Sequence, residues 1–426
     1  MKSEVIRGRD FFGAGKCLIW LLIGLIALPS VGFAGLVERE RAKRIFDRLT
    51  GESPSNTVLD TMEGLIVSGD PVAAARYAID GDTDANPNPT APNFGFYNVT
   101  LKNWAMPWTN EDSNVFAPLN DYAAMVIGMV RDERDFRQLL YGDILYTGNI
   151  SPAYSNSDNQ HYVALEGSGN NMGDPAVLQQ TTQTAETGID PNGAAGIFST
   201  RAAARAFFID GTNRAMFRFT LVNHLCTDLE QLQDTSGPSD RIRQDVSRSP
   251  GGDSQIFLNN CISCHIGMDP LAQAFAYYQF EYTNDNPDAG RLIYTPGFVQ
   301  PKYLINDTTF QPGYITPNDH WTNYWRLGPN SEKLGWLLAP ANSGAVDMAL
   351  NPEYSEGDGA ASLGMELANT EAFAHCQVKK VFQNVCLREP GVSDQTQFNQ
   401  FVTNFKSGYN VKNVFAEVAA YCASHL

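Results

Sequence analysis

The stretch Cys261-Ile262-Ser263-Cys264-His265 combines residue types and a spacing that could do chemistry. Two thiols separated by two residues can add to the two vinyl groups of a haem, and a histidine directly after the second thiol then lies beneath the ring. Its imidazole can serve as the proximal ligand of the iron. Because the sequence contains one C-x-x-C-H, we expect one covalent haem c, held by Cys261, Cys264 and His265.

Three other uses of the two thiols are less consistent with the sequence. A thioredoxin-like C-x-x-C needs a βαβ setting, which the surrounding pattern lacks, and has no use for the histidine. A zinc site needs two further ligands; Cys376 with His375 or Cys386 could supply them, but no second C-x-x-C and no H-x-H is present. A disulfide within the motif would be strained. The motif therefore favours haem.

A histidine that binds a metal generally donates its other ring hydrogen to a nearby acceptor. Pro270 follows His265 by five residues, and we expect its carbonyl, or that of a neighbour, to accept the Nδ1 hydrogen of His265. Met268 lies too close to His265 along the chain to reach the opposite face of a haem, so it is expected to pack beside the ring. Pro270 is thus included among the cofactor-binding residues.

The sixth position of the iron has several candidates. Met365 is the first, because it precedes a helix that Thr370 could cap, and small cytochrome c domains take a distal methionine from the segment before their last helix. Met348 is the second choice and His320 the third. A methionine would raise the reduction potential, whereas a second histidine would lower it.

Other residues could line the ring or bind its edge. Arg214 or Arg218 could pair with haem propionates, although a solvated or carboxylate-paired arginine is the alternative. Aromatic residues after the motif could form a wall, although such a stripe is also typical of an ordinary core; they are Phe275, Tyr277, Tyr278, Phe280 and Tyr282.

The first 34 residues resemble a secretory signal peptide. Four basic residues precede an apolar run, and Gly32 and Ala34 supply the small residues that a signal peptidase needs. The predicted mature chain begins at Gly35 and is exported, into the periplasm or elsewhere in the bacterial envelope. A retained membrane anchor is the alternative, and membrane contact is expected only in that case. Haem attachment follows export, so the two signals agree.

Charge and cysteines limit the partners and the covalent links. A formal net charge of −17 argues against nucleic acid or an anionic membrane surface as a partner.

Once the signal peptide and the C-x-x-C pair are set aside, four cysteines remain for two disulfides. Cys376 and Cys386 are ten residues apart on one predicted helix, about 15 Å along its axis, and cannot pair with each other. If that helix and the last one are antiparallel, Cys376–Cys422 and Cys226–Cys386 are the expected pairs.

The chain of 426 residues shows helical spacing of apolar residues in most segments, and the fold is expected to be mainly α. Helices are predicted over residues 36–80 and 120–146, on either side of Asp210-Gly211, and from the C-x-x-C-H through residue 282. Three amphipathic helices are predicted after residue 370. We divide the chain into a signal peptide (1–34), an N-terminal helical region with long loops (35–195) and a haem domain (196–426) with a loop-rich insertion at 283–360.

Residues 196–426 resemble the exported monohaem c-type-cytochrome-like proteins of bacteria, in which C-x-x-C-H is followed by Met-Asp-Pro. Here that element is "CISCHIGMDP", residues 261–270. The resemblance implies a cytochrome-c-like helical haem domain, haem binding and electron transfer, with no established substrate.

Two functions from different classes follow. The first is a periplasmic electron carrier with both axial positions of the haem filled, whose acidic surface steers a redox partner protein in the envelope. The second is a haem enzyme or small-ligand sensor with an open distal position, in which the N-terminal region and the 283–360 insertion build a pocket for peroxide, oxygen or an organic substrate. The length of the chain favours the second, since electron transfer alone needs far fewer residues. A third possibility makes the extra region a docking module for an envelope protein.

Overall fold

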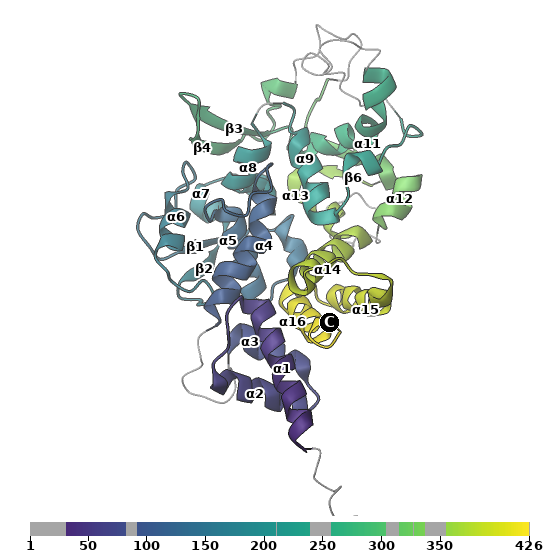
Figure 1. Cartoon of the computed structure of the whole chain (residues 1–426). Helices are drawn as coiled ribbons and strands as arrows, with labels where there is room; N and C mark the ends of the chain where they lie inside the picture. The colour runs from purple at the N-terminus through teal and green to yellow at the C-terminus, as the bar shows by residue number, and fades with distance from the viewer. Residues whose placement is uncertain are drawn as a thin grey trace, which may run out of the picture.

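The computed structural model describes residues 31–81, 92–209, 211–238, 257–303, 315–326, 328–336 and 355–425. It is mainly helical, as expected, with short two-stranded sheets (Figure 1). The helices are α1 (Val31–Thr50), α2 (Asn56–Val67), α3 (Pro71–Asp80), α4 (Lys102–Ala105), α5 (Asp121–Arg131), α6 (Gln160–Gly167), α7 (Gln183–Thr187), α8 (Arg201–Phe207), α9 (Arg214–Thr220), α11 (Ile262–Ala272), α12 (Pro329–Leu334), α13 (Gly359–Ala368), α14 (Glu371–Cys386), α15 (Gln395–Lys406) and α16 (Val411–Cys422). None of the described helices is both long enough and apolar enough to cross a membrane.

Local sequence signals set where the helices begin. The Asp70 carboxylate accepts a hydrogen bond of 2.8 Å from the amide of Ala73, and Pro71 occupies the first turn of α3, where a missing N–H costs nothing. The Thr370 hydroxyl accepts from the amide of Phe373 at 3.0 Å and so caps α14, as predicted. The predicted helices on either side of Asp210-Gly211 are α8 and α9.

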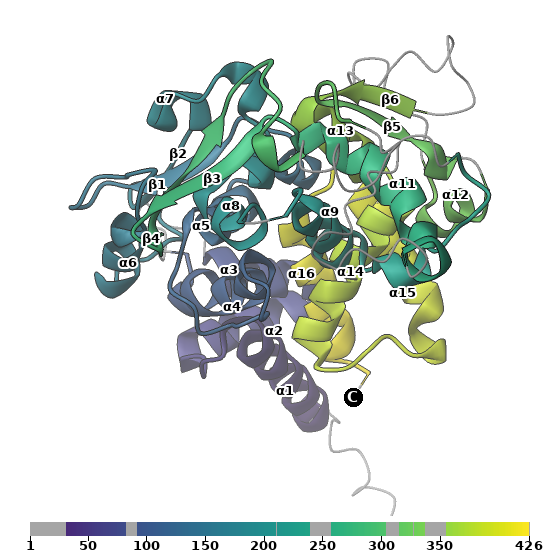
Figure 2. The same cartoon turned by 90° about the horizontal axis from the view of Figure 1, so that it is seen from above.

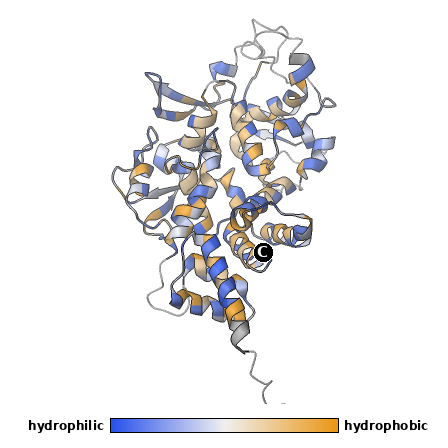
Figure 3. Ribbon diagram, viewed as in Figure 1, coloured by the Kyte–Doolittle hydropathy of each residue, from blue (hydrophilic) through white to orange (hydrophobic). Residues whose placement is uncertain are grey.

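The three predicted amphipathic helices at the C-terminus are present as α14, α15 and α16; α14 and α16 contact the N-terminal helix α1, and α15 packs on α14 and α16. In Figures 1 and 2, α16 lies against α1 and α3, from the opposite end of the sequence. The ring of Phe415 on α16 lies 5.3 Å from those of both Phe96 and Trp104. One hydrophobic core therefore contains residues from both sides of position 195. Hydrophilic residues are prominent along α1 (Figure 3).

The sheets are β1 (Leu145–Gly148) with β2 (Leu178–Thr181), β3 (Tyr278–Thr283) with β4 (Asn286–Tyr294), and β5 (His320–Asn323) with β6 (Ser355–Asp358), all antiparallel. The prediction of a helix through residue 282 was wrong. After a single 3₁₀ turn, Gln273–Phe275, the chain becomes strand β3, in which Tyr278 and Phe280 point into the core while Glu281 is exposed, the alternation of a half-buried strand. The 283–360 insertion also contains more regular structure than predicted: β4, β5, α12 and β6.

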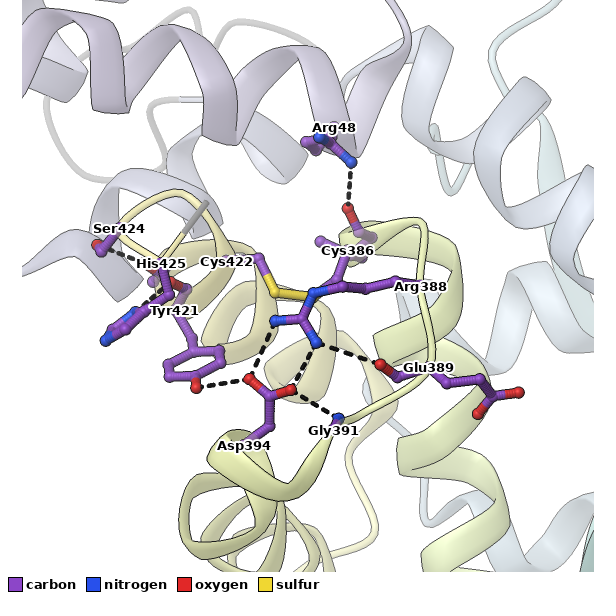
Figure 4. The surroundings of a disulfide bond; sticks show 12 residues. Arg48, Cys386, Arg388, Glu389, Gly391, Asp394, Tyr421, Cys422, Ser424 and His425 are labelled. Atoms are coloured by element: carbon purple, nitrogen blue, oxygen red, sulfur yellow. Dashed lines mark hydrogen bonds and ion pairs between the residues drawn. A yellow bond between two sulfur atoms is a disulfide. The ribbon is translucent and has the colours of Figure 1, made fainter.

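Both predicted disulfide pairs were wrong. Cys226 is bonded to Cys376, and Cys386 is bonded to Cys422 (Figure 4). The prediction assumed that α14 and α16 are antiparallel, which would bring the start of one to the end of the other. Instead their C-terminal ends lie together, with the Cα atoms of Cys386 and Cys422 5.7 Å apart.

Guanidinium groups from α1 contact the C-terminal ends of α14 and α16. Arg41 and Arg44 donate to the carbonyls of Ala420 and Ala423 near the end of α16, each at 3.4 Å. Arg48 donates to the carbonyl of Val385 at 3.3 Å, next to the Cys386–Cys422 disulfide (Figure 4). The last carbonyls of a helix have no partner within the helix and carry its partial negative charge. Cations at these positions therefore stabilise two helix ends that point the same way.

Replacing Arg48 with alanine is expected to lower the free energy of unfolding by about 0.5 to 1 kcal/mol, because it removes one cation from the end of α14. Urea unfolding monitored by tryptophan fluorescence measures the change. Lys43→Ala is the control on the same helix, since Lys43 forms an exposed pair with Asp47 one turn away and should have a smaller effect. Equal effects of the two substitutions would contradict the assignment of Arg48 to the helix end.

Candidate functional site

The C-x-x-C-H motif lies at the start of α11, where a π-helical turn, Phe257–Cys261, leads into the helix. Cys261, Cys264 and His265 are related as positions i, i+3 and i+4, so they lie on one face of the helix. Both cysteines are half-buried and neither is in a disulfide. The three side chains that the haem prediction requires are therefore neighbours on one partly accessible helix face.

Cys264 is a neutral thiol at neutral pH. Its Sγ lies 3.6 Å from the carbonyl oxygen of Leu229, and burial raises the pKa of the thiol. Redox-active C-x-x-C cysteines have the opposite property, a thiol pKa lowered by nearby positive charge or by a helix N-terminus. The environment of Cys264 thus argues against a reactive thiolate at this residue.

His265 belongs to a buried network with a carboxylate and an arginine. Its Nδ1 lies 3.1 Å from Oδ1 of Asp269, one turn further along α11. The Asp269 side chain is fully buried, and Arg214 on α9 contacts both of its oxygens, Nε to Oδ1 at 2.7 Å and Nη2 to Oδ2 at 2.8 Å. Burial alone would raise the pKa of Asp269, but Arg214 and His265 outweigh it and hold the pKa well below its usual range. An ionised carboxylate can only accept, so Nδ1 carries the hydrogen and Nε2 is the ring nitrogen suited to an iron.

Asp269 was not among the residues assigned from the sequence. The acceptor at Nδ1 was expected to be a backbone carbonyl, that of Pro270 or of a neighbour, and the structure places the Asp269 side chain there. The spacing of His265 and Asp269, four residues apart on one helix, was the signal that could have found it. Pro270 is buried inside α11, where its ring leaves the carbonyl of Ile266 without the usual helical donor. Met268 is buried, in line with a packing role.

The back of α11 is packed tightly against Trp325. A Cβ atom at Gly267 would lie 1.9 Å from Nε1 of Trp325, so only glycine allows this approach. Gly237 approaches the neighbouring residue of α11, Ile266, just as closely: a Cβ atom at Gly237 would lie 2.6 Å from Cγ2 of Ile266. These contacts fix the position of the helix that carries the motif.

Arg214 and Arg218 are both paired with carboxylates, the alternative to propionate binding. Arg218 contacts Asp228 through Nε at 2.8 Å and Nη2 at 2.6 Å, in a more exposed position. The residue before Arg214, the buried Asn213, donates to the carbonyls of Phe275 and Tyr278 at 2.9 and 3.0 Å. The predicted aromatic wall therefore does not continue α11; Phe275 and Tyr278 pack with Phe208 at the start of the β3 hairpin.

The candidates for the sixth iron position lie on other elements. Met365 is half-buried on α13, a helix that packs on the 3₁₀ turn after α11 and on β5. His320 begins β5, with Nδ1 2.9 Å from Asp358 Oδ1 and Nε2 3.6 Å from Glu356 Oε2. Both ring nitrogens of His320 therefore face carboxylates. Met348 lies outside the described residues, and Met365 stays a prediction.

The raised pKa of Asp319, the residue before His320, leads us to expect that the stability of the fold depends on pH. Burial, followed by the charge of Asp358, raises the pKa of Asp319 to about 6. The folded protein therefore binds this proton more tightly than the unfolded chain, and stability should fall as the pH rises from about 4 to about 6. Asp319→Asn should remove this part of the pH profile, as measured by thermal unfolding at several pH values. An unchanged slope over that interval would contradict the assignment.

The donor set of this site fits a haem better than a bare metal ion. Within the described ranges, no group of three or more His, Cys, Asp or Glu side chains could hold a metal ion by itself. Cys376 and Cys386, the cysteines considered for zinc, are both in disulfides. A haem iron takes its in-plane ligands from the porphyrin and needs only axial ligands from the protein. Two thiols outside disulfides and one oriented imidazole on a single helix face match that requirement.

Comparison with known proteins adds no relative. No family model, no curated protein and no solved structure matches this chain. The resemblance to exported c-type-cytochrome-like proteins stays a prediction carried by residues 261–270.

Proposed function

We propose that this chain is an exported monohaem c-type cytochrome that transfers single electrons. The observation that carries the proposal is the common face of α11, on which two thiols outside disulfides stand beside an imidazole oriented by a buried carboxylate. When bound, a haem supplies reversible one-electron chemistry at its iron.

The two cysteines would hold the group covalently. Each thiol adds its S–H across one vinyl double bond, the sulfur bonding to one carbon and the hydrogen to the other, so no atom leaves and no net oxidation occurs. Neither Cys261 nor Cys264 is fully buried, as this addition requires. Neither cysteine is in a disulfide, which agrees with the requirement.

His265 would be the proximal ligand, and Asp269 would set its orientation and basicity. A carboxylate at Nδ1 fixes the ring and increases electron donation from Nε2. Arg214 keeps Asp269 ionised inside the protein. The reduction potential of the site would therefore depend on residues from both α9 and α11.

The proposed redox partner is a basic protein of the envelope. A net charge of −17 gives the chain a field that attracts a positively charged surface and speeds association at low ionic strength. Export is part of the proposal, since the predicted signal peptide and covalent haem attachment require the same compartment; residues 1–30 lie outside the described residues.

The absorption spectrum of the reduced, purified protein with and without carbon monoxide tests the function. A low-spin spectrum that carbon monoxide leaves unchanged supports the electron carrier, because both axial positions are then filled. Met365→Ala should then open one of them, if Met365 is the distal ligand. A spectrum shifted by carbon monoxide would contradict the carrier and support the enzyme or sensor with an open position.

A further inference from the structure

A pocket of about 230 Å³ lies where β4 packs on α8, next to the end of α7 (Figure 2). Its lining residues come from three segments, within residues 154–156, 187–201 and 291–294, and none belongs to the C-x-x-C-H motif. Drug-sized ligands occupy sites of about 300 to 1,000 Å³. The pocket therefore suits a smaller molecule, of the size of a free amino acid or a monosaccharide.

A buried guanidinium lines this pocket without a carboxylate partner. Arg201 is 7% exposed, and its Nε donates to the carbonyl of Gly290 at 2.8 Å. Its Nη2 donates to the carbonyls of Pro287 and Asp288 at 3.4 and 2.6 Å. Within the described residues, Nη1 donates no hydrogen bond and the guanidinium forms no ion pair. Because a buried charge is normally paired, Arg201 can bind a negatively charged group of a ligand.

The charges around Arg201 nearly balance. Burial, only partly offset by the charge of Asp121, lowers the pKa of Arg201. The Asp121 carboxylate accepts hydrogen bonds from three backbone amides at the starts of α5 and α8. The other charges that act on Arg201 are those of Arg205, Asp158 and Asp288, and Asp288 itself pairs with Arg205. A ligand without net charge is therefore favoured over an anion.

A carboxylate without an ion pair lines the same pocket. Asp190 accepts from the amide of Asn192 through Oδ1 at 2.9 Å, and in the part of the chain that the structure describes it pairs with no cation. Its charge acts on Tyr294, another lining residue: burial, then the charges of Asp319 and Asp190, raise the pKa of the Tyr294 phenol. Asp190 can therefore accept a positively charged group of a ligand whose negative group binds Arg201.

Two phenols and an amide add neutral hydrogen-bonding groups. The side chains of Tyr154, Tyr294 and Asn156 line the pocket and form no hydrogen bond with other described residues. Burial raises the pKa of Tyr154 as well, so both phenols keep their hydrogens at neutral pH. The Tyr294 ring is held in place, since a Cβ atom at Gly193 would lie 2.5 Å from it and the ring of Tyr278 lies 4.8 Å away. Phenols and amides both donate and accept, as a polar uncharged side chain of a ligand requires.

We propose that this pocket binds a free α-amino acid with a polar, uncharged side chain. The α-carboxylate would pair with Arg201, the α-ammonium group with Asp190, and the side chain would bond to the two phenols and Asn156. A monosaccharide of the same size has no charge to match either Arg201 or Asp190. The residues involved lie outside the proposed haem site, so the inference goes beyond the proposed function and does not depend on it.

Isothermal titration calorimetry of the purified protein tests the proposal with L-glutamine, L-asparagine, L-serine and L-threonine. We expect saturable binding of at least one of them. The decarboxylated and deaminated analogues of that amino acid each lack one of the two charges, so each should bind about tenfold more weakly or worse. These analogues test the role of Arg201 without substituting it, because its bonds to the β3–β4 hairpin support the fold.

Asp190→Asn should weaken binding about tenfold, since an amide has no charge to pair with the ammonium group. The asparagine oxygen can still accept from the amide of Asn192, so the local turn is kept. Asp174→Asn is the matched control. Asp174 likewise accepts from the amide two residues later, that of Ala176 at 2.8 Å, but it does not line the pocket.

Four outcomes would overturn the proposal. The first is no saturable binding of any of the four amino acids at millimolar concentration. The second is an analogue without one of the charges that binds as tightly as the amino acid. The third is an Asp190→Asn variant, shown by circular dichroism to be folded, that binds as tightly as the Asp174→Asn control. The fourth is binding of glucose, a neutral monosaccharide, that is as tight as that of the amino acids.

Discussion

Asp269→Asn is expected to lower the free energy of unfolding by about 3 to 5 kcal/mol, the usual effect of removing one partner from a buried ion pair. The substitution nearly preserves the shape of the side chain but removes its charge. Arg214 would then keep its positive charge in a largely buried position without the carboxylate that now contacts it twice. His265 would lose the acceptor that orients its ring.

Chemical denaturation of the wild type and the variant measures this loss. Asp228→Asn is a matched control, because Asp228 also contacts an α9 arginine, Arg218, through two bonds but in an exposed position. Exposed pairs contribute about 0 to 1 kcal/mol, so the control should change stability little. Similar losses of stability in the two variants would show that the buried Asp269–Arg214 pair contributes no more to the free energy of unfolding than an exposed pair does.

Asp269→Asn should also make the free energy of unfolding less dependent on pH at acid pH. Because the pKa of Asp269 is lower in the folded protein than in the unfolded chain, its contribution is present above about pH 4 and is lost as the pH falls below that value. An asparagine has no such titration. Thermal unfolding between about pH 2 and 5 compares the two slopes; equal slopes would contradict the lowered pKa.

Removing the Cys226–Cys376 disulfide through the double substitution Cys226→Ala/Cys376→Ala is expected to lower stability by about 2 to 5 kcal/mol. The bond joins residues 150 positions apart and ties the segment after α9 to α14. Its loss frees a long loop in the unfolded chain. Replacing both cysteines avoids leaving a reactive thiol, and denaturant unfolding under non-reducing conditions measures the change.

The second disulfide supplies an internal comparison. Cys386 and Cys422 are separated by 36 positions, so the chain-entropy effect of Cys386→Ala/Cys422→Ala should be about 1 kcal/mol smaller. A larger loss from the 36-residue loop would mean that native packing around each bond, and not loop length, sets the order. Adding a reductant to the wild type should reproduce the sum of both effects.

The sequence predicted the helices better than the strands. Amphipathic spacing with clear caps and stops identified α14, α15 and α16, because each buries one stripe against the core. The apolar residues after Pro270 fit a helix as well as a strand. Burial of Tyr278 against Phe208, which favours the strand, depends on a segment more than sixty residues earlier.

Pairings between distant segments could not be predicted from spacing. The disulfides depend on the relative direction of α14 and α16, which is set by tertiary packing: both helices contact α1, and α16 also contacts α3. Spacing excluded a bond between Cys376 and Cys386 but could not choose among the others. The contact of Asp269 with His265 could have been predicted from the sequence, because Asp269 lies one helical turn after His265. Its contact with Arg214 could not, because that contact depends on the packing of α9 on α11.

The central claim is covalent attachment of one haem at Cys261 and Cys264, and the intact mass of the exported protein tests it most directly. The protein should be produced in cells that also mature a known c-type cytochrome, purified, and denatured before mass spectrometry. The account predicts the mass of the polypeptide plus one haem, and the polypeptide alone for Cys261→Ala/Cys264→Ala. A wild-type protein that carries no added mass, from cells in which the known cytochrome is fully haem-loaded, would contradict it.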